Sequence, residues 1–291
     1  MMRQFEIITA LITPFKKNGA IEIKKLINLI EEQIENGITS FVLFGTTGEG
    51  SSISCSEKLK AIKKITNYFK SSIYLLIGIS TLSTSEAIKQ AKLYSKYPID
   101  GLLVLTPTYL KTNEEGILSH FNAIAEASLK NVYLYHVPSR TGQNFDMKLL
   151  RILKQHPNIK GIKVASTSLK CLASALEFQS FNFQIYSGED LLLLDSLKMG
   201  AMGIISVSSN IYPRMMKKVV NLYLLNQKDG AEALFNQYKS SIESLFLEPN
   251  PIGAKYFLSL NNKIDLRYRL PLTYPSLEVM NIIKERYLED I

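Results

Sequence analysis

The feature that most constrains this chain is a repeated alternation of short apolar segments with helical patterns. Eight apolar, β-branched runs are separated by segments in which apolar residues recur at helical spacing. The expected strands are Glu6 to Thr13, Thr39 to Thr46, Ile73 to Ser80, Gly101 to Thr106, Val132 to Val137, Ile159 to Ala165, Phe183 to Ser187 and Met202 to Val207. Their ends lie between 19 residues (187 to 206) and 33 residues (13 to 46) apart, enough for one right-handed crossover each.

Eight such units predict a closed (β/α)8 TIM barrel of the α/β class, because strands that are apolar on both faces are buried on both sides. No GxGxxG motif follows the first expected strand, which argues against an open doubly wound sheet. After the eighth strand only helical patterns follow, at Pro213 to Leu225, Ala231 to Leu247, Ile252 to Leu260 and Pro275 to Leu288. We therefore expect a catalytic barrel over residues 1–225 and a C-terminal helical subdomain over residues 226–291.

Composition narrows the class of protein. The chain is 46% hydrophobic, yet its longest apolar runs fall short of the roughly 18 residues that a membrane span needs. Two cysteines without metal or redox spacing indicate a reduced, cytoplasmic protein. The net charge of +8 raises nucleic acid as a partner, but the lysines fall at polar positions of amphipathic helices. We expect a solvated basic surface that binds neither nucleic acid nor membrane.

Lys163 interrupts the apolar run of the sixth expected strand. Burying an ammonium without a partner is costly, and a lowered pKa relieves this cost by leaving a neutral amine. Such an amine can attack a carbonyl carbon and form a Schiff base. The alternative is a strand-end lysine whose stem packs on the sheet while its head reaches water.

Other candidates lie where the remaining strands end, since barrels of this kind place their chemistry there. The second strand runs into Gly45–Glu49, GTTGE, whose backbone N–H groups and the hydroxyls of Thr46 and Thr47 suit a small carboxylate. The alternative is that the GTTGE sequence forms a turn with a purely structural role. The fifth strand ends at Tyr135, and Arg140 follows in a loop bounded by proline and glycine, where a guanidinium can hold an anion. A packed tyrosine and a surface arginine are the alternatives.

Other chemistries find little support in the sequence. The three histidines lack an HExxH pattern and cysteine neighbours, so we expect no metal site, and no P-loop or G-x-S-x-G elbow occurs. Strand alternation points His136 away from Tyr135, which favours a structural histidine with satisfied hydrogen bonds. Glu49 is either a general base or a helix cap.

Several motifs together resemble a known family along the whole chain. They are GTTGE (Gly45 to Glu49), TPxY (Thr106 to Tyr109), YxVPSRTG (Tyr135 to Gly142), GIK (Gly161 to Lys163), SGED (Ser187 to Asp190), GIISV (Gly203 to Val207) and EPNPI (Glu248 to Ile252). The chain resembles the pyruvate-dependent class I aldolase (N-acetylneuraminate lyase) superfamily, and within it the dihydrodipicolinate synthase family. The motif with Arg140 is what separates this family from the sialic acid lyases.

The resemblance implies a lyase that condenses pyruvate with aspartate semialdehyde in diaminopimelate and lysine biosynthesis, without a cofactor and as a homotetramer built from two dimers. It also implies residue roles: Lys163 for the pyruvate imine, Thr46 and Thr47 for the pyruvate carboxylate, Tyr135 for proton transfer, Tyr109 reaching in from a neighbouring subunit, Arg140 for the carboxylate of the second substrate, and Gly188 and Ile205 for the pocket wall. Two alternatives stay open: a sister aldolase or lyase that cleaves a 2-keto sugar acid, and a non-catalytic binding protein that kept the barrel.

Departures from the family pattern bear on regulation. Thr108, His136 and Val164 stand where the synthases usually carry tyrosine, asparagine and glutamate. Positions that hold lysine as a feedback effector in inhibited members read differently here, with only Glu86 kept; they are Gly50, Ser51, Cys55, Lys58, Leu82 and Thr108. The resemblance therefore predicts an enzyme that is insensitive to millimolar lysine.

Overall fold

The computed structural model describes residues 5–289. Its eight strands follow one another in a closed barrel, and the strand pairs are parallel. The strands are β1 (Glu6–Ala10), β2 (Ser40–Leu43), β3 (Tyr74–Ile79), β4 (Gly101–Leu105), β5 (Asn131–His136), β6 (Ile159–Val164), β7 (Gln184–Ser187) and β8 (Gly203–Ser206). The predicted (β/α)8 barrel is confirmed. Every residue of β2 and β8 is buried, which explains why these strands are continuously apolar.

The helices predicted between the strands are present. The longer ones are α1 (Ile23–Glu35), α2 (Cys55–Phe69), α3 (Thr84–Tyr94), α4 (Glu114–Ala127), α7 (Leu169–Leu176), α9 (Pro213–Leu224), α10 (Lys228–Ser244), α11 (Ile252–Leu260) and α12 (Leu277–Glu289). Side-chain caps begin α3 and α4: Ser83 accepts a hydrogen bond from the Glu86 N–H, and Asn113 accepts one from the Gly116 N–H. Ser54 and Ser276 accept in the same way at the starts of α2 and α12.

Three segments differ from the expected helices and loops. The helices expected after β5 and β7 begin as 3₁₀ turns, η2 (Met147–Leu149) and η3 (Asp190–Leu192), and continue as short helices α6 (Leu150–Leu153) and α8 (Leu193–Lys198). The loop expected around Arg140 is a short helix, α5 (Pro138–Thr141). Its proline at the first helical turn fixes φ, and Gly142 at φ +65° ends the helix, so the same two residues that indicated a loop bound a helical turn.

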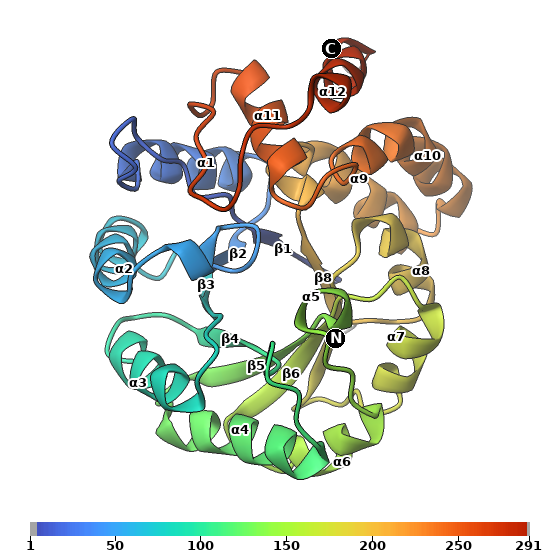
Figure 1. Cartoon of the computed structure of the whole chain (residues 1–291). Helices are drawn as coiled ribbons and strands as arrows, with labels where there is room; N and C mark the ends of the chain where they lie inside the picture. The colour runs from blue at the N-terminus through green and yellow to red at the C-terminus, as the bar shows by residue number, and fades with distance from the viewer. Residues whose placement is uncertain (1–4, 290–291) are drawn as a thin grey trace. The chain divides into compact units, whose positions relative to one another are not determined.

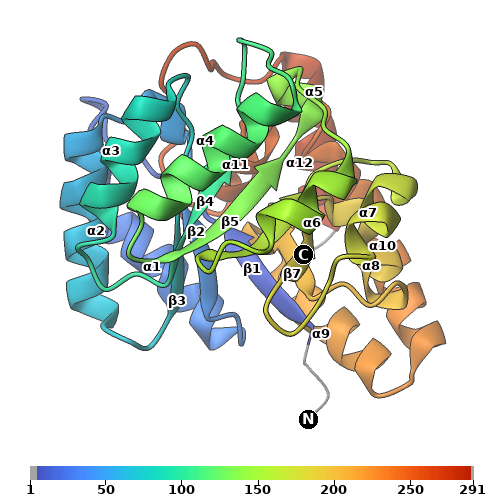
Figure 2. The same ribbon diagram turned by 90° about the horizontal axis from the view of Figure 1, so that it is seen from below.

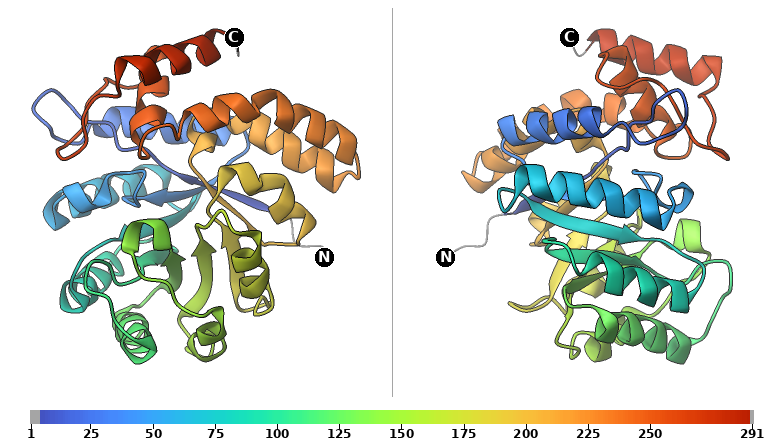
Figure 3. Two further views of the ribbon diagram at one scale, coloured as in Figure 1. Left: turned by 45° about the vertical axis from the view of Figure 1, so that its right-hand side comes forward. Right: turned by 90° about the vertical axis from the view of Figure 1, so that its left-hand side faces the viewer.

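The described chain forms two compact units. Unit 1 contains the residues up to Glu6 and Ile65–Ile205, and unit 2 contains residues 7–64 and 206–289. In unit 1, α3, α4 and α6 lie outside strands β4 to β6 (Figure 1), and α4 packs on α3 and along β5 (Figure 2). In unit 2, α10 packs against α9 and α12, and α12 packs against α11 (Figure 3).

Unit 1 carries a polar layer near the beginnings of its strands. The hydroxyls of Tyr74 and Tyr133 lie 2.8 Å apart, Tyr133 and Tyr186 both donate to the Gln184 Oε1 atom, and Tyr186 also bonds Glu6. Burial raises the pKa of Tyr133 and Tyr186, so both remain neutral donors. This layer satisfies its own polar groups at the end of the strands where barrels place stability rather than chemistry.

Candidate active site

Lys163 lies near the carboxyl end of β6, with 5% of its surface exposed. Its register partners are Tyr135 on β5 and Tyr186 on β7, so the lysine is flanked by a tyrosine on each side. The Lys163 Nζ atom lies 4.7 Å from the centroid of the Tyr135 ring, and Tyr135 is itself buried. The ring face stabilises a positive charge on nitrogen, whether an ammonium or an iminium. Lys163 and Tyr135 are therefore brought together as the sequence predicted.

Gly188 forms a wall directly against the lysine side chain. A Cβ atom at this position would lie 2.6 Å from Lys163 Cε and 2.8 Å from the Ala165 Cβ atom. The Gly188 N–H donates to the Val164 carbonyl at 2.8 Å, which holds the segment after β7 against the end of β6. Only glycine fits here without displacing its neighbours.

The segment that carries Arg140 is held by hydrogen bonds. The Thr141 hydroxyl donates to the Val137 carbonyl at 3.2 Å, and the Gln143 side-chain oxygen accepts from the Thr112 N–H at 2.8 Å. Arg140 itself is exposed and stands on the last turn of α5. An anionic group can thus reach its guanidinium from solvent.

Glu189, which the sequence did not single out, lies in the field of both cations. Burial raises the pKa of its carboxyl group, while the positive charges of Lys163 and Arg140 lower it and Asp190 raises it further. The side chain is half-buried, and its backbone N–H bonds the Ser187 hydroxyl at 3.3 Å. The SGED letters were visible as a motif, but only the fold reveals that Lys163 and Arg140 both act electrostatically on this carboxylate.

Two further predicted residues of unit 1 occupy different surroundings. Ile205 is fully buried at the end of β8. Tyr109 is 83% exposed and holds a left-handed backbone at φ +67°, which a tyrosine adopts only when the loop requires it. Next to it, Leu110 is 70% exposed. This loop presents two large side chains to solvent.

The GTTGE turn belongs to unit 2 and is built from close backbone contacts. A Cβ atom at Gly50 would lie 1.8 Å from the Phe44 carbonyl oxygen, and the Gly50 N–H donates to the Gly45 carbonyl at 3.0 Å. The Thr13 hydroxyl donates to the Gly48 carbonyl at 2.7 Å. The Thr47 hydroxyl accepts from the Asn250 amide at 2.9 Å, a contact that no sequence signal revealed. Thr46 keeps a partly exposed side chain.

Glu49 is neither a general base nor a helix cap. Its carboxylate forms an ion pair with Lys255, and both side chains are fully buried. The Lys255 Nζ atom also lies 4.4 Å from the centroid of the Phe15 ring and 5.2 Å from that of Tyr268. The signal was present in the sequence, because Lys255 interrupts an apolar helix as Lys163 interrupts an apolar strand.

Arg269 contacts this region in two ways: its backbone N–H donates to the Glu49 carboxylate at 3.2 Å, and its side chain holds the neighbouring segments. It pairs with Glu57, donates to the Ser52 carbonyl at 2.8 Å and to the Gly19 carbonyl at 2.7 Å. The hydrogen bond from Arg269 lowers the pKa of Glu57 to about 2. Of these two ion pairs, Glu49–Lys255 includes a residue of the GTTGE turn, and Arg269–Glu57 holds the segment that follows the turn.

His136 was expected to be a satisfied structural histidine, and this is only half correct. It is fully buried, with its ring 4.6 Å from that of Phe145. Neither ring nitrogen makes a well-formed hydrogen bond within residues 5–289. Burial lowers its pKa to about 4, with the Asn144 side chain opposing the shift. The ring therefore packs as a neutral aromatic group.

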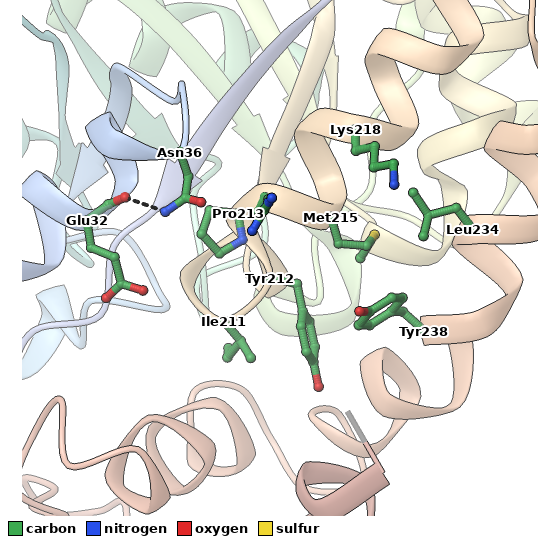
Figure 4. A pocket seen from close by; sticks show the side chains of 10 residues that line it. Glu32, Asn36, Ile211, Tyr212, Pro213, Met215, Lys218, Leu234 and Tyr238 are labelled. Carbon is green, nitrogen blue, oxygen red and sulfur yellow. Dashed lines mark hydrogen bonds between the residues drawn. The ribbon is translucent and has the colours of Figure 1, made fainter. Parts of the chain in front are cut away.

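A cavity of about 570 Å³ lies in unit 2, and none of the predicted site residues lines it. It is lined by side chains of α1, α9 and α10 and of residues that flank α1 and α9, among them Tyr212 and Tyr238, whose rings lie 5.3 Å apart (Figure 4). Glu32 at its rim already pairs with Lys263. Arg214 and Lys218 line it as exposed cations.

Neither a metal cluster nor a membrane span is found in residues 5–289. This part of the chain contains no group of three or more histidine, cysteine or acidic side chains placed to hold a metal ion. Within the same residues, no helix has both the length and the apolar character required to cross a bilayer.

A closed barrel with a buried lysine against a tyrosine on the neighbouring strand defines a lyase of the class I aldolase type. Residues 4–286 match the Dihydrodipicolinate synthetase family, and the chain belongs to that family. A 4-hydroxy-tetrahydrodipicolinate synthase from Chlorobium phaeobacteroides is 35% identical over 277 residues, which cover 95% of this chain and 94% of that protein.

Solved structures agree with this assignment. The dihydrodipicolinate synthase from Acinetobacter baumannii, described as chloride-inhibited and complexed with pyruvate, superposes with a TM-score of 0.93 at 34% identity and covers 99% of both chains. The synthase from Cyanidioschyzon merolae with lysine bound gives a TM-score of 0.93 at 31% identity, covering 98% of this chain and 97% of that one.

Proposed function

We propose that this enzyme condenses pyruvate with L-aspartate 4-semialdehyde to 4-hydroxy-tetrahydrodipicolinate, in diaminopimelate and lysine biosynthesis. The observation that carries the proposal is the buried Lys163 amine against the Tyr135 ring, in a chain of this family. The relatives described above are named as synthases, and one of them is complexed with pyruvate. The names of these relatives favour condensation over cleavage of a 2-keto sugar acid, and the pyruvate complex supports pyruvate as the first substrate.

In this proposal Lys163 attacks the ketone carbon of pyruvate and forms an imine with loss of water. The imine withdraws electrons from the methyl carbon, so that a methyl proton can be removed and the resulting enamine can attack an aldehyde. Tyr135, directly beside the amine, transfers the protons together with Thr46, and Thr47 binds the pyruvate carboxylate. Gly188 and Ile205 shape the pocket around the imine. None of these steps requires a metal or an organic cofactor.

Arg140 selects the second substrate. Its exposed guanidinium on α5 binds the carboxylate of the incoming aldehyde through two parallel hydrogen bonds. Tyr109 acts across a subunit interface in a homotetramer made of two dimers. Support for an interface comes from the exposure of Tyr109 and Leu110 in this loop, at 83% and 70%, and of Leu82 in the loop after β3, at 69%. We place this enzyme in the cytoplasm.

We further propose that lysine does not inhibit this enzyme at millimolar concentration. A relative binds lysine, but here Leu82 and Thr108 offer no equivalent of the amide and phenol that would bind the effector's carboxylate. Losing two hydrogen bonds to a charged group weakens binding by roughly 10²- to 10⁴-fold. Lys58 adds a like charge opposite the effector's ammonium.

The test is a direct assay of the purified protein. Pyruvate with aspartate semialdehyde should give product formation, and a panel of 2-keto sugar acids should give no pyruvate release. A lysine titration to several millimolar should leave the rate unchanged. Efficient cleavage of a sugar acid, with no condensation, would contradict the proposal.

A further inference from the structure

The proposed acceptor carries an α-ammonium as well as an α-carboxylate. The groups assigned so far in unit 1 that can carry charge are an arginine, which repels an ammonium ion, and a lysine-derived imine, which repels one when it is protonated. A site that prefers an amino aldehyde over its des-amino analogue needs an anion or acceptor at the position of the amine. A carboxylate in this position would let the enzyme discriminate the amino aldehyde from its des-amino analogue by charge as well as by shape.

The backbone of Glu189 is fixed beside the Lys163 side chain. It follows Gly188, which lies so close to the Lys163 side chain that a methyl group on it would come within 2.6 Å of Lys163 Cε. The Ser187 hydroxyl and the 3₁₀ turn that follows hold the Glu189 backbone, since the Leu192 N–H donates to the Glu189 carbonyl at 3.1 Å. The segment is thus fixed at the carboxyl end of β7, two strands from the one that leads to Arg140.

Charge and exposure single out this carboxylate. Lys163 and Arg140 both act on Glu189 electrostatically, so its side chain lies within the field of the imine-forming amine and of the guanidinium. The neighbouring Asp190 is 3% exposed at the start of η3, whereas Glu189 is half-buried and can reach a bound molecule. Partial burial also strengthens a charged contact, because water screens it less.

We propose that Glu189 is a specificity-determining residue that binds the α-ammonium of the amino aldehyde, while Arg140 binds its α-carboxylate. This inference rests on the proposed condensation. The two residues then recognise the two charges of a zwitterionic head, and the aldehyde carbon is directed toward the Lys163 enamine. The simpler role for Glu189 is only to orient Arg140 or Lys163, and the experiment separates the two roles.

The experiment compares two acceptors, aspartate semialdehyde and succinate semialdehyde, which has the same carboxylate and aldehyde but no amine. Glu189→Gln is compared with wild type, with Glu189→Asp and with Glu126→Gln, a neutralised exposed glutamate on α4. Losing a hydrogen bond between charged groups should lower kcat/KM for aspartate semialdehyde by about 10- to 100-fold. The rate with succinate semialdehyde, and borohydride trapping of the pyruvate imine, should stay within about twofold.

Glu189→Asp should recover part of the discrimination, and Glu126→Gln should match wild type. An equal loss with both acceptors would overturn the proposal in favour of positioning Arg140, and loss of imine trapping would overturn it in favour of positioning Lys163. Unchanged discrimination in Glu189→Gln would also overturn it. A wild-type protein that forms the imine but uses neither acceptor would instead contradict the proposed function.

Discussion

The Lys163 Nζ atom lies 4.7 Å from the centroid of the Tyr135 ring, across two adjacent strands in register. The ring and the hydroxyl of Tyr135 can be separated by mutation. Tyr135→Phe keeps the aromatic face beside the amine and removes the proton-transferring group. We expect kcat to fall by about 10²- to 10⁴-fold with the melting temperature little changed. Steady-state kinetics with calorimetry checks this, and a near wild-type rate would remove Tyr135 from the proton relay.

Gly188→Ala should impair catalysis by displacing the lysine. The added methyl group would lie 2.6 Å from Lys163 Cε and 2.8 Å from the Ala165 Cβ atom, so one of them has to move. A displacement of this size should lower kcat/KM by about 100-fold. Gly230→Ala is the matched control, because the nearest atom to its new methyl group is 4.0 Å away and α10 gains a better helix former. Equal activity in both variants would show that catalysis does not depend on the close contact between Gly188 and the Lys163 side chain.

We expect the effects of substituting Glu49 and Lys255 on the free energy of unfolding to be strongly non-additive. Lys255→Met leaves an uncompensated buried carboxylate and should reduce the free energy of unfolding by about 3–5 kcal/mol. Adding Glu49→Gln removes the charge and keeps an oxygen for the Arg269 N–H, which donates to Glu49 at 3.2 Å. Urea unfolding of both single variants and the double variant should therefore show recovery in the double. Additive losses would contradict this account of the pair.

His136 predicts a loss of stability in acid. Its pKa is lowered from 6.5 to about 4 in the folded state, so the folded protein resists protonation while the unfolded chain accepts it. The stability is complete above pH 6.5 and falls as pH drops from there to about 4, by about 3 kcal/mol in total. Because the pKa of His120 is lowered too, the measurement is the difference in urea stability between wild type and His136→Asn across this range. Parallel pH curves would exclude His136 as the source.

The sequence predicted the barrel and its order of elements because each strand is apolar on both faces and each helix is amphipathic. It also placed Lys163 and Tyr135 together, since both stand at ends of consecutive strands. The helical conformation of Pro138–Thr141 was missed because proline and glycine bound loops and short helices alike. The division into a barrel over 1–225 and a subdomain over 226–291 stays a prediction.

Long-range polar contacts were the part that no local pattern could show. Glu49 and Lys255 are separated by 206 positions, and Asn250 and Thr47 by 203. The role of Glu189 could not be predicted from the sequence either, because it depends on the charges of Lys163 and Arg140, which lie on other elements. Lys255 carries the same sequence signal as Lys163, because each is a lysine within an apolar segment.

The central claim is that Lys163 forms the imine with pyruvate, and borohydride trapping tests it most directly. Incubation with pyruvate and borohydride, followed by peptide mass spectrometry, should show one reduced adduct per chain on the peptide that contains Lys163. Lys163→Ala should give no adduct while remaining folded. An adduct on another lysine, or none in the wild-type protein, would contradict the account.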